Sequence, residues 1–174
     1  MFRNRYSKRM RLYHGSDQIV EKPRILEPNR RMDFGKGFYT TQSYKQAERW
    51  ARDVRRKRGA DHAYVSEYEY NESGRLRVLV FDGPTEEWLD FVETNRLKGD
   101  LHDYDIVIGP VADEGVYYVL LLYESGAISS EETIIRLEAA RLDGQVLFHT
   151  DKSLDDIVFM GFKEVERRSL RNGC

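Results

Sequence analysis

The sequence predicts a single domain of the α+β class. The chain has 174 residues, and at this length one hydrophobic core buries roughly 70% of the surface that the unfolded chain exposes. Segments with the composition of strands are interspersed with segments of helical period, but the two kinds do not alternate strictly, which favours α+β over a doubly wound sheet. The nucleotide-binding patterns G-x-G-x-x-G and G-x-x-x-x-G-K-[ST] do not occur.

Five strands are expected where β-branched and aromatic residues alternate with polar ones or form short apolar runs. They span residues 11–14, 64–70, 76–81, 105–111 and 145–149. The four prolines are interpreted as loop residues and not as a hinge between two domains.

Two helices are predicted from apolar side chains that recur every three or four residues. The first carries Tyr44, Ala47, Ala51 and Val54. The second carries Trp88, Phe91, Val92 and Asn95.

Two further helices are predicted in the second half of the chain. Ser129 followed by Glu132 forms a capping-box pattern in front of a helix over residues 130–142. Residues 113–124 fit a helix that Gly126 would terminate, although their valines and tyrosines would also suit a strand. We predict a helix there.

Composition excludes several classes of protein. The 28 basic and 30 acidic side chains give a formal charge of -2, so no general affinity for polyanions is expected. The single cysteine, Cys174, has no partner for an intrachain disulfide, which indicates a reducing compartment and excludes a cysteine-based metal site. No pair of histidines has the spacing of metal ligands, so no metal is predicted.

The sequence predicts a cytoplasmic protein that does not bind membranes. The longest apolar run covers residues 116–123, whereas about 20 residues are needed to span a bilayer. The first residues are basic but lack the apolar centre of a signal peptide. We expect a basic N-terminal tail over residues 1–10, a folded domain over residues 11–162 and a charged C-terminal tail over residues 163–174.

Two short motifs carry most of the functional information. His14, Gly15 and Ser16 lie at the end of a predicted strand. The second motif, residues 33–41, reads Asp-Phe-Gly-Lys-Gly-Phe-Tyr-Thr-Thr and precedes a predicted helix. Either motif alone fits a purely structural role, as a histidine at a tight turn or as a glycine-rich turn with core aromatics.

Taken together, the two motifs and the helix after them resemble the NAD-binding half of the ADP-ribosyltransferase superfamily. The similarity is to the branch that includes poly(ADP-ribose) polymerases and diphtheria toxin. The chain also resembles a family of small, uncharacterised bacterial domains in that superfamily, which is expected to include toxins of toxin–antitoxin pairs. Residues 104–112 and 145–150 continue the likeness, which covers about residues 11–162.

The resemblance implies an ADP-ribosyltransferase-like fold: two split, mostly antiparallel sheets with helices around an NAD cleft. By position, His14 would bond the adenine-side ribose and the Gly15 backbone would hold the nicotinamide carboxamide. Tyr39 would pack on the nicotinamide ring, where a cation over an aromatic face gains roughly 0.5–2 kcal/mol. The flanking Ser16 and Gly37 would line the same site.

Trp50 matches the second aromatic of the nicotinamide sandwich when the motif is counted without a gap from Tyr39. A role as an ordinary core residue of its helix fits this tryptophan equally well. His149 shares a strand face with Gln145, so a place in the same cleft is an alternative to the favoured interpretation, in which it has no role there.

The third catalytic position departs from the superfamily pattern. Strong transferases carry a glutamate where this chain has Gln145, whose amide can accept a hydrogen bond from ribose but brings no negative charge to the developing cation. Loss of one electrostatic partner costs roughly 10²–10³ in rate. Asp143 would supply a carboxylate, or else belong to the turn that connects a helix to the strand.

The function implied by the resemblance is mono-ADP-ribosyl transfer with NAD as substrate, in which His14, Tyr39 and Gln145 are catalytic. The acceptor would be a protein or a nucleic acid, and an antitoxin protein would neutralise the activity. Two alternatives stay open: an NAD glycohydrolase, with water as acceptor, and a non-catalytic module that binds NAD or a protein.

Overall fold

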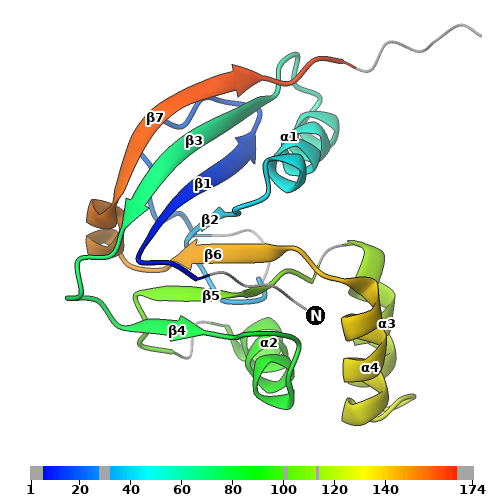
Figure 1. Ribbon diagram of the computed structural model, residues 1–174. Coiled ribbons are helices and arrows are strands. Elements are labelled where there is room, and N and C mark those ends of the chain that lie inside the picture. Colours follow the sequence, from blue (N-terminus) through cyan, green and yellow to red (C-terminus); the bar gives the residue numbers. More distant parts are fainter. Residues whose placement is uncertain (1–5, 28–31, 100–101, 113, 168–174) are drawn as a thin grey trace, which may run out of the picture.

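The computed structural model folds the chain around two β-sheets that face each other (Figure 1). It describes residues 6–27, 32–99, 102–112 and 114–167. One sheet has three strands in the order β1-β3-β7, and the other has four in the order β2-β6-β5-β4. Helices lie on the outer sides of both sheets. The α+β class predicted from the sequence is confirmed.

The three-stranded sheet is antiparallel throughout. Its strands are β1 (Arg9–Ser16), β3 (Tyr64–Asn71) and β7 (Ile157–Glu164). Helix α1 (Tyr44–Arg58) packs on its outer face (Figure 1).

The four-stranded sheet is mixed. Strands β2 (Phe38–Thr40), β6 (Gly144–Phe148) and β5 (Ile106–Pro110) pair antiparallel in that order. Strand β4 (Val78–Val80) pairs parallel with β5. The two parallel strands are joined by a helical crossover, as parallel pairing requires.

Three helices cover the outer face of the four-stranded sheet (Figure 1). They are α2 (Glu86–Lys98), α3 (Glu114–Glu124) and α4 (Ser130–Ala140). A short 3-10 turn, η1 (Asp151–Asp156), joins β6 to β7.

The side chains in front of the helices explain where three of them begin. Ser43, Thr85 and Ser129 each accept a hydrogen bond from the backbone N–H three residues further on, in α1, α2 and α4 respectively. The helix predicted after Ser129 begins there, with Ser129 as its N-cap, while the Glu132 carboxylate accepts from Arg136 Nε. The ambiguous segment is also a helix, and Gly126 follows its end with φ 74°, as expected of a glycine that stops a helix.

Apolar side chains form three clusters that separate the layers. The first lies between the two sheets and includes Leu12, Phe38 and Phe148. A second lies between the four-stranded sheet and its helices, with Trp88 at its centre. The third joins α1 to the outer face of the three-stranded sheet, through small residues such as Ala47.

The described residues contain seven strands, so the prediction of five was wrong. The missed strands are β2 and β7. Strand β2 has three residues, too few to show an alternating pattern. Strand β7 carries apolar residues on both faces, because Val158 and Met160 are exposed, and its register shifts where Gly161 faces Glu67.

The folded part of the chain extends beyond both predicted tail boundaries. Strand β1 begins at Arg9, and β7 ends at Glu164. Val165 is buried, and its N–H donates to Ala63 O over 2.7 Å. Residues 1–5 and 168–174 of the predicted tails lie outside the described residues. In the part that is described, no helix combines the length and the apolar character needed to cross a membrane.

Candidate functional site at the junction of β1 and β2

The two sheets touch through one antiparallel backbone bridge between β1 and the residue after β2. Tyr13 N–H donates to Thr41 O over 2.8 Å, and Thr41 N–H donates to Tyr13 O over 2.9 Å. The register of this bridge places Gly15 opposite Tyr39, although no further bridge forms there within the described ranges. The two strands therefore separate at the first motif.

The backbone of Gly15 lies on the open edge of β1. Residues of an antiparallel strand turn their N–H and C=O alternately toward one neighbour and the other. Since Tyr13 points these groups toward Thr41 and away from β3, Gly15 points its own to the same side. Within the described residues, no hydrogen bond reaches either group of Gly15 on that edge.

The absence of a side chain at Gly15 has a structural cause on the other face of the strand. A Cβ there would lie 1.9 Å from Ala47 O and 2.7 Å from Ala51 N, both in the backbone of α1. Contacts this short require glycine. The sequence-based explanation, that a ligand needs the close approach, is therefore not required to account for the residue type.

His14 links the two sheets through its side chain. Its Nδ1 lies 2.7 Å from Tyr39 O, and because a carbonyl only accepts, Nδ1 carries the proton. Burial lowers the pKa of His14 below its usual range, although the bond to Tyr39 opposes this. The imidazole is consequently neutral, with Nε2 as an acceptor, and its ring lies 4.5 Å from that of Phe38.

Tyr39 fixes the glycine-rich segment that precedes it. Its hydroxyl donates to Gly35 O over 2.6 Å and accepts from Phe34 N–H over 3.2 Å. The half-buried ring packs against the helix-side cluster, next to Leu147, its partner in β6.

Two histidines outside the motifs hold the same segment. His102 Nε2 lies 2.7 Å from Phe34 O, and His149 Nδ1 lies 2.7 Å from Lys36 O. Their rings are 4.2 Å apart. With the bond from the Tyr39 hydroxyl to Gly35 O, each of the three consecutive backbone carbonyls of residues 34–36 is bonded by a side chain. The sequence offered a place in the cleft for His149 only as the less favoured alternative, and it contained no signal for His102.

The other glycine and serine of the motifs have mainly local roles. Gly37 has φ 147°, and a Cβ on it would lie 2.2 Å from Phe148 O, so it lets the chain pass β6 closely. Ser16 Oγ donates to Asp17 Oδ1 over 3.2 Å and accepts from Gln18 N–H over 3.4 Å, which closes the turn after β1.

Gln145 lies on the helix side of β6, two residues from Leu147 and on the same face. It is 3% exposed, and its Nε2 donates to Pro110 O over 3.3 Å. Four side-chain atoms of the described residues are both fully enclosed and without a hydrogen-bond partner. Gln145 Oε1 is not among these four atoms. No donor of the described residues bonds this oxygen either, so it is an acceptor that is neither paired nor fully enclosed within them.

A carboxylate stands beside Gln145, but it is not the predicted one. Asp143 forms an ion pair with Arg49 on the surface, over 2.6 Å, and so serves the contact between α1 and the start of β6. Asp33 is the buried neighbour. Its carboxylate binds Arg96 Nε at 3.0 Å and accepts from Ala112 N–H over 3.3 Å.

Burial raises the pKa of Asp33 above its usual range. Arg96, the Ala112 N–H and, as the smallest contribution, a hydrogen bond from the Gln145 amide act in the opposite direction. The sequence analysis quoted Asp33 as part of the second motif without giving it a role. Only the three-dimensional contact with Gln145 and Arg96 singles it out.

Trp50 lies on α1 and is half-buried. Its ring forms no pair with Tyr39 or with another aromatic ring of the described residues. A sandwich would need a ligand between the two rings, so the predicted role of Trp50 stays a prediction.

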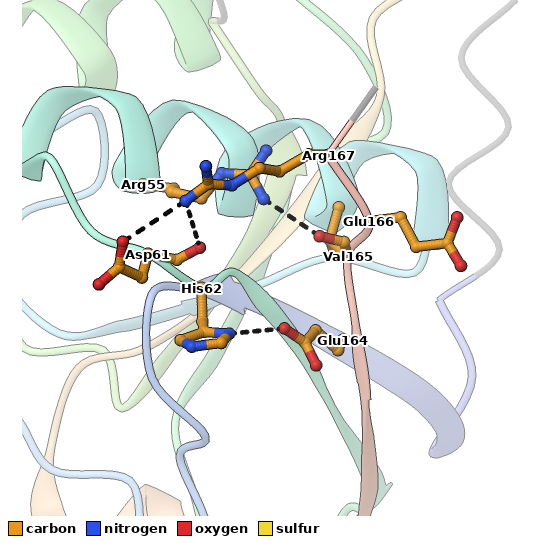
Figure 2. A pocket seen from close by; sticks show the side chains of 7 residues that line it. All are labelled: Arg55, Asp61, His62, Glu164, Val165, Glu166 and Arg167. Atoms are coloured by element: carbon orange, nitrogen blue, oxygen red, sulfur yellow. Dashed lines mark hydrogen bonds and ion pairs between the residues drawn. The ribbon is translucent and has the colours of Figure 1, made fainter. Parts of the chain in front are cut away.

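A separate open pocket of about 500 Å³ lies at the far end of α1 (Figure 2). It is lined by Arg55, Asp61, His62 and the segment 164–167. Two pairs join side chains of its lining: His62 with Glu164 over 2.7 Å, and Arg167 with Asp61 over 3.5 Å. None of the predicted site residues lines it. Among the described residues, no group of three or more potential metal ligands occurs.

The fold and the candidate site define an α+β protein whose two sheets meet at a His-Gly strand end and a glycine-rich strand start. A model of the family described as "Protein of unknown function (DUF3990)" matches residues 10–159. Because the match covers most of the chain, the protein belongs to this family. Comparisons with curated proteins and with solved structures found no match.

Proposed function

We propose that the protein is an NAD-dependent ADP-ribosyltransferase that binds the nicotinamide end of NAD at the junction of β1 and β2. One observation carries the proposal: the backbone N–H and C=O of Gly15, which find no partner among the described residues, lie beside His14 on an edge that faces Tyr39. The second support is the resemblance of the two motifs to ADP-ribosyltransferases, which is a likeness of sequence alone. NAD serves as a substrate, and no metal is part of the proposal.

The Gly15 backbone is complementary to a carboxamide. Nicotinamide presents one carbonyl acceptor and one NH₂ donor, and Gly15 offers one N–H and one C=O on the same strand edge. Each such neutral hydrogen bond contributes about 0.5–1.5 kcal/mol net. A flat amide can extend the edge of β1 much as a further strand would.

His14 and Tyr39 supply contacts of different kinds. The neutral imidazole keeps Nε2 as an acceptor, which suits a ribose hydroxyl. The half-buried ring of Tyr39 offers a π-face to the positive pyridinium, a contact worth roughly 0.5–2 kcal/mol.

The reaction breaks the bond between the nicotinamide nitrogen and C1′ of ribose. The bonding electron pair leaves with nicotinamide, whose positive charge is thereby neutralised, and C1′ develops an oxocarbenium-like charge. An acceptor heteroatom on a macromolecule then donates a lone pair to C1′ and releases its proton to water. The products are nicotinamide, the ADP-ribosylated acceptor and a proton.

Gln145 is assigned to the nicotinamide-side ribose. Its Nε2 donates to Pro110 O, which leaves Oε1 to accept from a ribose hydroxyl. The position corresponds to the glutamate of strong transferases, and the amide predicts slower turnover by up to roughly 10²–10³.

The acceptor is a protein or a nucleic acid, and the cellular role we propose is that of a cytoplasmic toxin held in check by an antitoxin protein. This part of the proposal rests on the sequence resemblance. Growth of bacteria that express the wild-type chain or its Tyr39→Ala variant tests it, because only the wild type should slow growth.

The proposed activity is tested by incubating the purified protein with NAD labelled in the adenosine part and in the nicotinamide. A transferase releases nicotinamide and leaves the adenosine label on macromolecules of an added extract. A glycohydrolase releases nicotinamide and free ADP-ribose. Binding of NAD without release identifies a non-catalytic module, and absence of both binding and release overturns the proposal.

A further inference from the structure

Asp33 is held in place by two partners near the end of strand β5. Arg96 of α2 binds one carboxylate oxygen at 3.0 Å, and the N–H of Ala112, just after β5, donates to the other over 3.3 Å. The Gln145 amide of β6 donates to Pro110 O, two residues before Ala112, and it lowers the pKa of Asp33, so the amide lies close to the carboxylate. Both charged side chains are largely buried, with 12% of Asp33 and 17% of Arg96 exposed.

The same contacts fix the orientation of the Gln145 amide. The Pro110 carbonyl can only accept, so it faces the NH₂ group of Gln145 and not its oxygen. The amide also lowers the pKa of Asp33, as a donor near the carboxylate does. The NH₂ group of Gln145 is therefore turned toward Pro110 O and Asp33. Its Oε1 is then directed away from Asp33 and Pro110.

Asp33 also belongs to the segment that Tyr39 holds. The Tyr39 hydroxyl bonds Phe34 N–H and Gly35 O, the residues that follow Asp33. Phe34 itself is fully buried in the helix-side cluster. The carboxylate therefore stands at a fixed place between Gln145 and the segment that leads to Tyr39.

We propose that Gln145 and Asp33 share the two roles of a single catalytic glutamate. Gln145 Oε1 accepts a hydrogen bond from the ribose hydroxyl, while the neighbouring Asp33 carboxylate orients the amide and supplies the negative charge. This inference rests on the proposed transferase function. Asp33 is a positioning residue, because it acts on the reacting sugar through Gln145. The bond that breaks, and the path of its electron pair and proton, are those given above.

The pair explains why glutamine occupies position 145. A glutamate there would place a second carboxylate against Asp33, in a site where Arg96 is the cation and is already shared with Glu124 at 3.4 Å. Two buried carboxylates in contact cannot both ionise easily. Glutamine avoids this repulsion, and its amide lowers the pKa of the neighbouring Asp33.

The inference predicts that the carboxylate of position 33 and the amide of position 145 can be exchanged with partial retention of activity. Asp33→Asn removes the charge and should lower nicotinamide release by about tenfold to a hundredfold, less than the 10²–10³ of a direct electrostatic partner. Gln145→Glu should also lower it, because of the repulsion. The double variant Asp33→Asn with Gln145→Glu restores one acid and one amide, and should recover at least tenfold over either single variant.

The closing experiment measures kcat and KM for nicotinamide release, together with thermal unfolding, for the wild type, both single variants and the double variant. Asp143→Asn is the matched control, since Asp143 is another carboxylate close to the start of β6 but binds Arg49 instead. We expect Asp143→Asn to have the kcat and KM of the wild type. The substitutions at positions 33 and 145 should change kcat more than KM.

The pH profile adds a readout that a purely structural role would not change. The charged groups that face Asp33 are Arg96 from α2 and, behind it, Glu124 from α3. In the wild type kcat should rise with pH as Asp33 ionises. Asp33→Asn should abolish this rise, whereas the double variant should show it again.

The outcomes separate the two proposals. Wild-type protein that releases no nicotinamide removes the transferase function and this inference with it. Wild-type activity that Asp33→Asn leaves unchanged, or a folded double variant no more active than the single ones, overturns the inference alone.

Discussion

The Nδ1 of His14 lies 2.7 Å from the carbonyl oxygen of Tyr39, at the point where backbone pairing between the two sheets stops. One side chain thereby joins the two motifs that the sequence places about twenty-five residues apart. The bond also selects the tautomer that leaves Nε2 as an acceptor. The contact between the sheets and the chemistry proposed for the site thus depend on the same imidazole.

Replacement of His14 separates these two roles. Asparagine can donate to Tyr39 O much as Nδ1 does, but it has no group in the place of Nε2. We expect His14→Asn to keep most of the stability and to weaken NAD binding several-fold, in line with about 0.5–1.5 kcal/mol for one neutral hydrogen bond. His14→Ala should lose both. Calorimetric titration with NAD and thermal unfolding measure the two effects, and equal NAD affinity in all three proteins would remove His14 from the site.

The lowered pKa of His14 predicts how stability depends on pH. The unfolded chain binds a proton at this residue near pH 6.5, whereas the folded chain resists protonation. The free energy of unfolding should therefore fall as the pH drops from 6.5 to the lowered pKa of the folded state, by at most about 1.4 kcal/mol per pH unit. Denaturant unfolding of the wild type and His14→Asn over this range measures it, and identical slopes would contradict the assignment.

Asp33 gives a pH dependence of the opposite sign. Burial raises its pKa above the 3.8 of an unfolded aspartate, so the folded protein holds this proton more tightly. Its contribution to the free energy of unfolding should fall as the pH rises from 3.8 to the raised pKa, and then stay constant. Unfolding curves of Asp33→Asn should lack this component, and a wild-type profile that parallels the variant would exclude it.

His149 is predicted to stabilise the glycine-rich segment before Tyr39. Removal of its bond to Lys36 O and its contact with His102 should cost about 1–2 kcal/mol in His149→Ala and should weaken NAD binding as the segment loosens. His62→Ala is the control, because His62 is exposed and its partner Glu164 lies in the other pocket. Similar losses of NAD affinity in both variants would show that the effect is not local.

The packing of α1 against Gly15 predicts a large effect of a single methyl group. Gly15→Ala places a Cβ 1.9 Å from Ala47 O and should destabilise the fold by about 3 kcal/mol or more. Gly74→Ala is the comparison: nothing lies within 4 Å of its Cβ, and only φ 72° opposes the change, at about 1–2 kcal/mol. Thermal unfolding measures both variants. Equal losses would mean that α1 packs less closely than described.

The sequence predicted the α+β class, all four helices and the five strands that carry a clear pattern. It missed β2, which is short, and β7, an edge strand whose apolar residues lie on both faces and whose register shifts near Gly161. These two strands are held by pairing with partners far along the chain, namely β6 and β3. No local pattern encodes such pairing.

For the candidate site, the motifs identified His14, Gly15 and Tyr39, which the structure brings together. They did not identify Asp33 as the neighbour of Gln145, nor His102 and His149 as supports of the segment between Asp33 and Tyr39. The two histidines act through contacts between residues 68 and 113 positions apart, and a single sequence contains no signal for such contacts. Gly15 is the reverse case: its motif was recognised, but α1 explains its residue type.

The most direct test of the account follows the backbone amide of Gly15 by NMR while NAD or nicotinamide is added. The account predicts that this amide resonance shifts in a saturable way toward that of a hydrogen-bonded amide. Resonances of the pocket around His62 and Glu164 should stay in place. A Gly15 amide that does not respond to either ligand, or a response confined to that other pocket, would contradict the proposed NAD site.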